Sequence, residues 1–151
     1  MRIKCSVLLA TAGLLVAMIV PSAASAHGTH QKAKMAGSKV IGASGAPNGE
    51  GTAKLHLLRN KSRVCFTIKY SGIGSRDGLS IGVYRGKKAE NGAEKIVLVN
   101  QEKKDPIHGC VNGVARGLLK KMTRSPHRFH VNLKTDNYPV DGAMRGQLKG
   151  L

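Results

Sequence analysis

Residues 129–148 read FHVNLKTDNYPVDGAMRGQL, and their pattern is the clearest indication of the fold. The first part of this stretch places Phe129, Val131 and Leu133 at every second position, which is the period of a β-strand with one buried face. The Tyr-Pro-Val-Asp-Gly segment that follows has residues typical of a turn, and alternation then resumes up to Leu148. The pattern predicts a β-hairpin, and it places His130 on the face of the first strand that points to solvent.

Similar alternating segments recur along most of the chain before residue 129. Residues 53–57 and 64–68 are two of them, and the short polar connection between the two predicts an antiparallel pair. Residues 115–123 differ, because their apolar side chains recur at helical spacing. About seven or eight short strands result. We therefore expect an all-β fold, an antiparallel β-sandwich or barrel of immunoglobulin-like or superoxide-dismutase-like Greek-key type, with one short helix.

The first 26 residues have the features of a secretory signal peptide. Arg2 and Lys4 form a basic start, residues 7–20 are almost wholly apolar, and an Ala-Ser-Ala cleavage site follows. A membrane anchor is the alternative, but the apolar run is shorter than the about 20 residues that span a bilayer. We expect residues 1–26 to be removed, leaving a secreted or periplasmic protein without a transmembrane segment.

The remainder of the chain is expected to form a single domain. Residues 27–37 are polar and carry lysines without a periodic pattern, which predicts a flexible N-terminal arm. Strand patterns begin at residue 38, so residues 38–151 should make up the domain. Cys65 and Cys110 lie in this part, and an even pair of cysteines in an exported chain predicts a disulfide.

The chain is strongly basic, with a formal net charge of +17. Such a charge attracts anionic polymers, acidic proteins and anionic membrane surfaces. The densest group of basic residues lies on and after the predicted helix and consists of Arg116, Lys120, Lys121, Arg124 and Arg128. Three of these recur at a spacing of four residues, so they share a helix face, and we take the group as a hypothetical anion-binding site. The alternative is an ordinary solvated helix face.

Dedicated nucleic-acid binding is not expected. Proteins that bind single strands combine a basic groove with aromatic stacking platforms. Aromatic residues make up only 3% of this chain, and the predicted export also argues against such a role.

Several segments resemble the CHRD domain, the module first named in the chordins. That family ends with a Val-Asn-containing strand, an aromatic-Pro turn and a Gly-x-Ile-Arg-Gly-Gln-Leu strand, and the matching letters here are VNLKT, YPVDG and GAMRGQL. Earlier matches are GTAKL at residues 51–55 and the Cys-Phe-Thr that begins at Cys65. The resemblance covers nearly all of residues 38–148. It implies an extracellular interaction scaffold, so we expect a binding or structural role at the cell envelope or outside the cell.

The resemblance also bears on metal binding. In the middle of the domain the family commonly carries His-Ile-His-x-Gly, whereas this chain has Gly82 and Tyr84 at the two histidine positions, and Lys134 stands where a later family histidine would be. A zinc or copper site needs three or four donors, so we expect no metal and no cofactor. No catalytic motif is present either, so we expect no catalytic residues and no enzyme. The alternative is a copper- or zinc-handling protein of superoxide-dismutase-like architecture.

Overall fold

The computed structural model describes residues 28–101 and 104–151, so the predicted signal peptide lies outside the described residues. None of the helices in the described part is long and apolar enough to cross a membrane. That part contains an α-helix, α1 (Arg116–Arg124), three short 3-10 helices (Gly37–Lys39, Arg59–Lys61, Pro126–Arg128) and the strands β1 (Thr29–Ala36), β2 (Glu50–Leu58), β3 (Arg63–Ser71), β4 (Ser80–Arg85), β5 (Glu94–Asn100), β6 (Ile107–Asn112), β7 (Phe129–Lys134), β8 (Met144–Gln147) and β9 (Lys149–Gly150).

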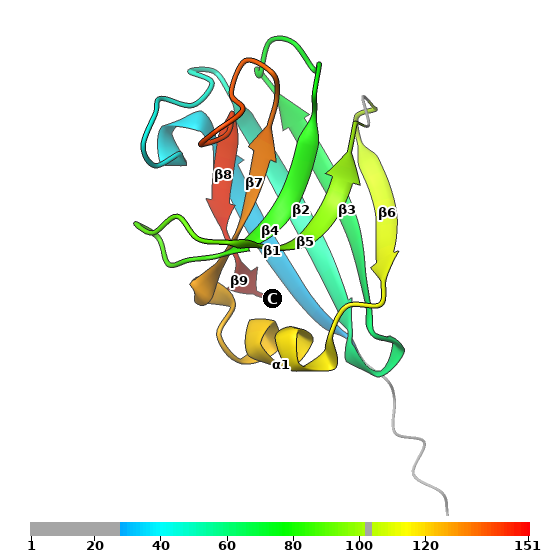
Figure 1. Ribbon diagram of the computed structural model, residues 1–151. Coiled ribbons are helices and arrows are strands. Elements are labelled where there is room, and N and C mark those ends of the chain that lie inside the picture. The colour runs from blue at the N-terminus through cyan, green and yellow to red at the C-terminus, as the bar shows by residue number, and fades with distance from the viewer. Residues whose placement is uncertain (1–27, 102–103) are drawn as a thin grey trace, which may run out of the picture.

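The strands form one antiparallel sheet that curls into a nearly closed barrel (Figure 1). The strand order is β5-β4-β7-β8-β1-β2-β3-β6, and the short β9 pairs with β1. The two end strands, β5 and β6, contact each other and almost close the ring. β7 returns beside β4 rather than beside β6, as in a Greek key. The predicted all-β fold with one short helix is confirmed, in its barrel form.

The predicted hairpin is also confirmed. β7 and β8 pair with His130 opposite Gln147 and Leu133 opposite Met144. The chain between them, residues 135–143, carries the Tyr-Pro-Val-Asp-Gly turn residues.

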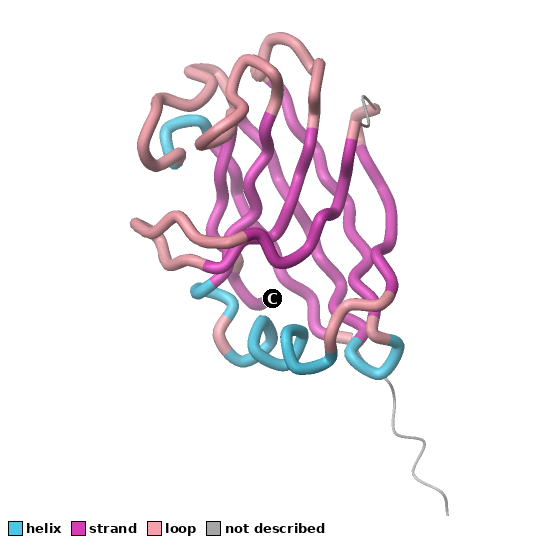
Figure 2. The backbone as a smooth tube through the Cα atoms, viewed as in Figure 1, coloured by secondary structure: helices cyan, strands magenta, loops and turns pink. Residues whose placement is uncertain are grey.

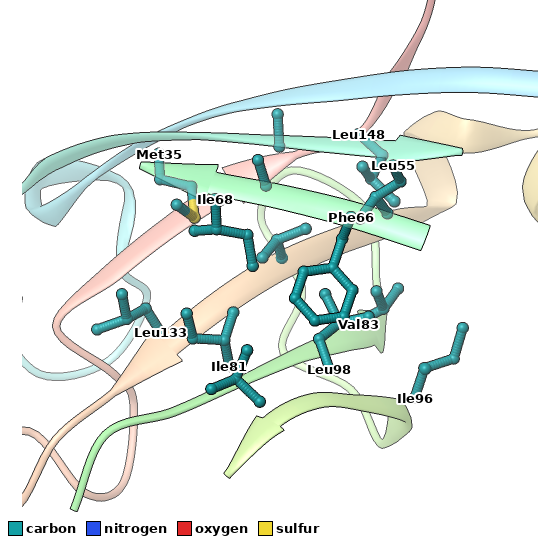
Figure 3. Close-up of a cluster of buried hydrophobic side chains, with 14 of the residues drawn as sticks. Met35, Leu55, Phe66, Ile68, Ile81, Val83, Ile96, Leu98, Leu133 and Leu148 are labelled. Carbon is teal, nitrogen blue, oxygen red and sulfur yellow. The ribbon is translucent and has the colours of Figure 1, made fainter. Parts of the chain in front are cut away.

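The core fills the inside of the barrel, because every strand turns its alternate apolar side chains inward. In Figure 3, Met35, Leu55 and Phe66 come from one wall and face Ile81 and Leu133 from the other. Figure 2 shows the strands running through the body of the molecule, with α1 across one end. Two side chains of α1 are fully buried there, those of Leu119 and Met122. The helix therefore closes that end of the core.

The prediction of a flexible arm over residues 27–37 is wrong for most of that segment. Residues 29–36 form β1, which pairs with the whole of β2, from Thr29 opposite Leu57 to Ala36 opposite Glu50. The other edge of β1 pairs with β8 and β9. The domain therefore begins at β1 and not at residue 38.

Buried side chains explain why this polar-looking segment is a strand. Gln31, Ala33 and Met35 alternate inward and are 0%, 0% and 3% exposed. The Gln31 amide nitrogen donates a hydrogen bond of 2.7 Å to the main-chain oxygen of Met122. That bond satisfies a carbonyl in the last turn of α1, which the helix itself leaves without a partner. β1 thus contacts both the core and the helix.

The predicted disulfide is present. Cys65 on β3 and Cys110 on β6 are directly opposite in the register and are joined. Both side chains lie on the outer face of the barrel, where Cys110 is exposed. The bond closes a loop with a sequence separation of 45, and constraining a loop of that size in the unfolded chain stabilises the fold by about 4 kcal/mol.

A substitution on each face of β1 tests the corrected assignment. Ala33→Asp would place a carboxylate among buried apolar side chains, so the free energy of unfolding should fall by about 3 kcal/mol or more. Lys34→Gln, on the exposed face of the same strand, should change it by less than about 0.5 kcal/mol. Both values come from urea titration of the purified domain. A flexible arm would make the two variants equally harmless.

Replacing both cysteines tests the disulfide. The double variant Cys65→Ala, Cys110→Ala should lose about 2–5 kcal/mol of unfolding free energy. Because the pair lies on the outer face, little packing is lost with it, and the reduced wild-type protein should match the double variant. Equal stability of the oxidised wild type and the variant would contradict this expectation.

Candidate anion-binding site

The predicted basic group on α1 is exposed as expected. Arg116, Lys120 and Arg124 lie one helical turn apart on the solvent-facing side, and Lys121 and Arg128 are exposed as well. The Arg116 guanidinium donates to the Ser62 hydroxyl at 3.4 Å and to the Asn60 carbonyl at 3.3 Å. We call these five residues the helix stripe. Its role in anion binding stays a prediction.

A second basic surface, which was not expected from the sequence, is a groove of about 1140 Å³ beside β1, β8 and β9. Its walls come from β1, β8, β9, the segment after β1 and the loop between β4 and β5. These last two segments project from the same side of the barrel in Figure 1. Among the described residues, no aspartate or glutamate lines the groove. Its basic side chains are Lys32, Lys34, Lys39, Lys87, Lys88, His127, Arg145 and Lys149.

Three lysines stand in a row across neighbouring strands, and two of them, Lys32 and Lys149, line the groove. Lys32 on β1 is directly opposite Lys54 on β2 and directly opposite Lys149 on β9. Like charges in directly opposed positions destabilise a sheet, by roughly 0.2–1 kcal/mol for each pair. The strand pairing therefore holds positive charges together at a cost, which a bound anion would offset.

Arg145 connects the groove to a polar layer beneath it. This residue is 2% exposed, and its guanidinium donates to the Lys87 and Glu90 carbonyls, both at 2.8 Å, and to the Asn91 side chain at 2.9 Å. The loop between β4 and β5 is thereby held against β8. Within residues 28–101 and 104–151, no carboxylate forms an ion pair with Arg145. Burial lowers the pKa of its guanidinium, because the charged form is poorly solvated there.

Gln147 fixes the start of the same loop. Its side-chain nitrogen lies 2.8 Å from the Gly86 carbonyl and 2.7 Å from the carbonyls of His127 and Phe129. The Asn91 side chain in turn donates to the Ile41 carbonyl at 3.0 Å. The two outer walls of the groove are therefore tied to each other and to the sheet.

The prediction that His130 faces solvent is wrong. The side chain is 2% exposed, because the loop between β4 and β5 covers the outer face of β7. Its ring stacks on Tyr84, with centroids 5.6 Å apart, and its Nδ1 lies 3.2 Å from the Arg145 guanidinium. A neutral ring with its proton on Nε2 can accept a hydrogen bond from Arg145 through Nδ1.

The surroundings keep this imidazole neutral. Burial, followed by the charge of Arg145, lowers the pKa of His130 to about 4, against a smaller opposing effect of the Gly86 carbonyl. Burial and the neighbouring Glu94 carboxylate raise the pKa of Tyr84. Both rings are therefore uncharged at neutral pH, and they serve as packing and hydrogen-bonding groups between β4, β7 and the loop.

The three positions at which the CHRD resemblance places histidines come together on this outer face. Gly82 is opposite Asn132, Tyr84 is opposite His130, and Lys134 lies at the end of β7. The Lys134 ammonium is 5.5 Å from the centre of the Tyr84 ring. Across the described residues, no group of three His, Cys, Asp or Glu side chains could hold a metal ion.

One histidine pair was not foreseen. His30 on β1 and His56 on β2 are directly opposite, and their rings stack with centroids 4.1 Å apart. Burial and the neighbouring His30 lower the pKa of His56. Two imidazoles are fewer than the three or four donors of a zinc or copper site.

Comparison with known proteins gives one match. The family model of the CHRD domain matches residues 31–148, a range that begins within β1 and ends just after β8. Neither the curated proteins nor the solved structures contain a match.

The buried imidazole predicts a pH dependence of stability. The pKa of His130 is about 4 in the folded protein, against an ordinary value of 6.5 for the unfolded chain, so the unfolded state binds the proton first as pH falls. The contribution of His130 is complete above about pH 6.5, declines between about pH 6.5 and 4, and amounts to at most about 3 kcal/mol. Urea titrations across this range should show the decline.

His130→Gln should make that profile clearly shallower, since the replacement does not titrate, and leave the part that His56 contributes through its own lowered pKa. The matched control is His127→Gln, which removes an exposed imidazole and should leave the profile unchanged. A wild-type profile that is already flat between pH 6.5 and 4 would rule out the burial of a neutral His130.

Proposed function

Because this chain belongs to the CHRD domain family, we propose that it is an exported binding protein, not an enzyme, that holds an anionic partner in the groove beside β1 and β8. One observation carries the proposal. The groove gathers six lysines and Arg145, and no aspartate or glutamate of the described part of the chain lines it.

The electrostatics of the groove favour an anion. Concave surfaces lined by charges of one sign concentrate the field and raise the local concentration of oppositely charged ligands. The formal charge of +17, which becomes +15 when Arg2 and Lys4 are removed with the expected signal peptide, adds a long-range attraction. Candidate partners are a sulfated or phosphorylated polymer, an acidic protein and an anionic membrane surface, each of which presents several negative groups to the lysines.

The features that support an exported location are independent of the groove. Residues 1–26 have the pattern of a signal peptide. A disulfide joins Cys65 and Cys110, and such bonds persist in oxidising compartments such as the periplasm and the extracellular space. We therefore place the binding role at the cell envelope or outside the cell.

The polar side chains beneath the groove support binding rather than catalysis, because they are buried or already hydrogen-bonded. His130 is buried and does not line the groove, so its imidazole does not face a ligand bound there. Arg145 and Gln147 already bond the main-chain oxygens of the loop between β4 and β5. The polar side chains left for a ligand are the lysines, Ser38 and His127, and lysines bind anions through their charge alone.

Retention on a heparin-like column tests the proposal. The groove variant carries Lys34→Gln, Lys88→Gln and Lys149→Gln. The stripe variant carries Lys120→Gln, Lys121→Gln and Arg124→Gln. The control carries Lys61→Gln, Lys95→Gln and Lys104→Gln. All nine side chains are exposed, and each variant loses three charges. The groove variant should elute at clearly lower salt than the other two, because its charges act together on one ligand.

Two other outcomes would contradict the proposal. If the stripe variant elutes first, the site is the helix stripe on α1. If all three variants shift equally, only net charge matters, and the groove has no special role in retention.

A further inference from the structure

The groove is basic, but part of its wall is apolar. Val40, Ile41, Ala89 and Leu151 line it together with the lysines. Leu151 is 78% exposed, one of three large apolar side chains that the described part leaves in solvent. Lysine side chains also present long aliphatic stems beneath their ammonium groups. A polyanion such as heparin would contact the lysines of this groove but would make no apolar contact with Val40, Ile41, Ala89 and Leu151.

The apolar wall is fixed in place rather than loose. The main-chain oxygen of Ile41 accepts a hydrogen bond of 3.0 Å from the Asn91 side chain, and Asn91 also accepts one of 2.9 Å from Arg145. The amide of Leu151 donates to the His30 carbonyl at 3.1 Å. A ligand therefore meets an apolar wall whose main chain is already positioned, which lowers the ordering cost of binding.

Building on the proposed function, we infer that the groove binds a single phosphate-bearing lipid molecule, with its phosphate among the lysines and its aliphatic chain along Val40, Ile41 and Leu151. The size agrees with this class of ligand. Small-molecule sites measure about 300–1,000 Å³, and the open groove of about 1140 Å³ slightly exceeds that range, which leaves room for a single-chain lipid. The charges also agree, because a phosphate monoester is an anion of up to two charges that several lysines can share.

Three probes separate the contributions of head and chain. Lysophosphatidic acid carries both, glycerol 3-phosphate carries only the phosphate, and a monoacylglycerol of the same chain length carries only the chain. Titration calorimetry is done below the micellar concentration. Lysophosphatidic acid should bind at least about tenfold more tightly than either of the other two, a factor that the burial of about two methylene groups supplies.

Two variants of equal charge locate the chain. Ile41→Ser with Leu151→Ser removes apolar wall from the groove, and should lower the affinity for lysophosphatidic acid to that for glycerol 3-phosphate. Val97→Ser with Val140→Ser removes exposed apolar groups elsewhere, at 53% and 74% exposure, and should leave the affinity unchanged. Thermal unfolding of both variants confirms that each is folded.

The outcomes distinguish this inference from the proposed function. If lysophosphatidic acid binds no more tightly than glycerol 3-phosphate, the lipid inference is overturned, while heparin retention through the groove still stands. If the chain adds affinity but the control pair abolishes it as much as the groove pair, the lipid binds outside the groove and the inference is again overturned. If the groove variant changes neither heparin retention nor phosphate binding, the proposed function itself is overturned.

Discussion

The structure depends on the double pairing of β1. One edge of this strand pairs with β2 along its whole length, and the other edge pairs with β8 and β9. In the strand order, β1 therefore joins the half made of β5, β4, β7 and β8 to the half made of β2, β3 and β6. The same strand sends Ala33 and Met35 into the core and exposes Lys34 in the groove. Fold and candidate site thus share one element.

Arg145 connects the sheet to the loop between β4 and β5, which forms another wall of the groove. A buried charge without an ion-pair partner is costly unless hydrogen bonds satisfy it. Here main-chain carbonyls and the Asn91 side chain satisfy it, so the loop has to stay folded against the barrel to keep the guanidinium solvated. The groove walls are consequently part of the folded core and not an independent flap. Binding at the groove would act on a surface that is already rigid.

The sequence predicted those parts of the fold that depend on strongly apolar alternation. Phe129, Val131 and Leu133 located the hairpin, and the pairing of Cys65 with Cys110 followed from the expected export. β1 was missed because its inward side chains include Gln31 and Ala33, which contribute little hydrophobic contrast. The periodicity of β7 showed which face enters the core, but it could not show that a distant loop covers the other face and buries His130. The helix stripe was visible because its spacing is local. The groove was not, because its lysines come from segments that only the sheet register brings together.

The Cys65–Cys110 bond has a consequence for association between molecules. It fastens β6, one of the two outermost strands, to β3. End strands open locally more readily than the rest of a fold, and peeling β6 away would uncover the main-chain donors and acceptors of β3. An uncovered strand edge is a template for pairing with another chain, and the neighbouring β3 side chains Val64, Phe66 and Ile68 are strongly apolar. Because the bond keeps β6 attached to β3, it hinders aggregation of the folded protein through the edge of β3, in addition to stabilising the fold.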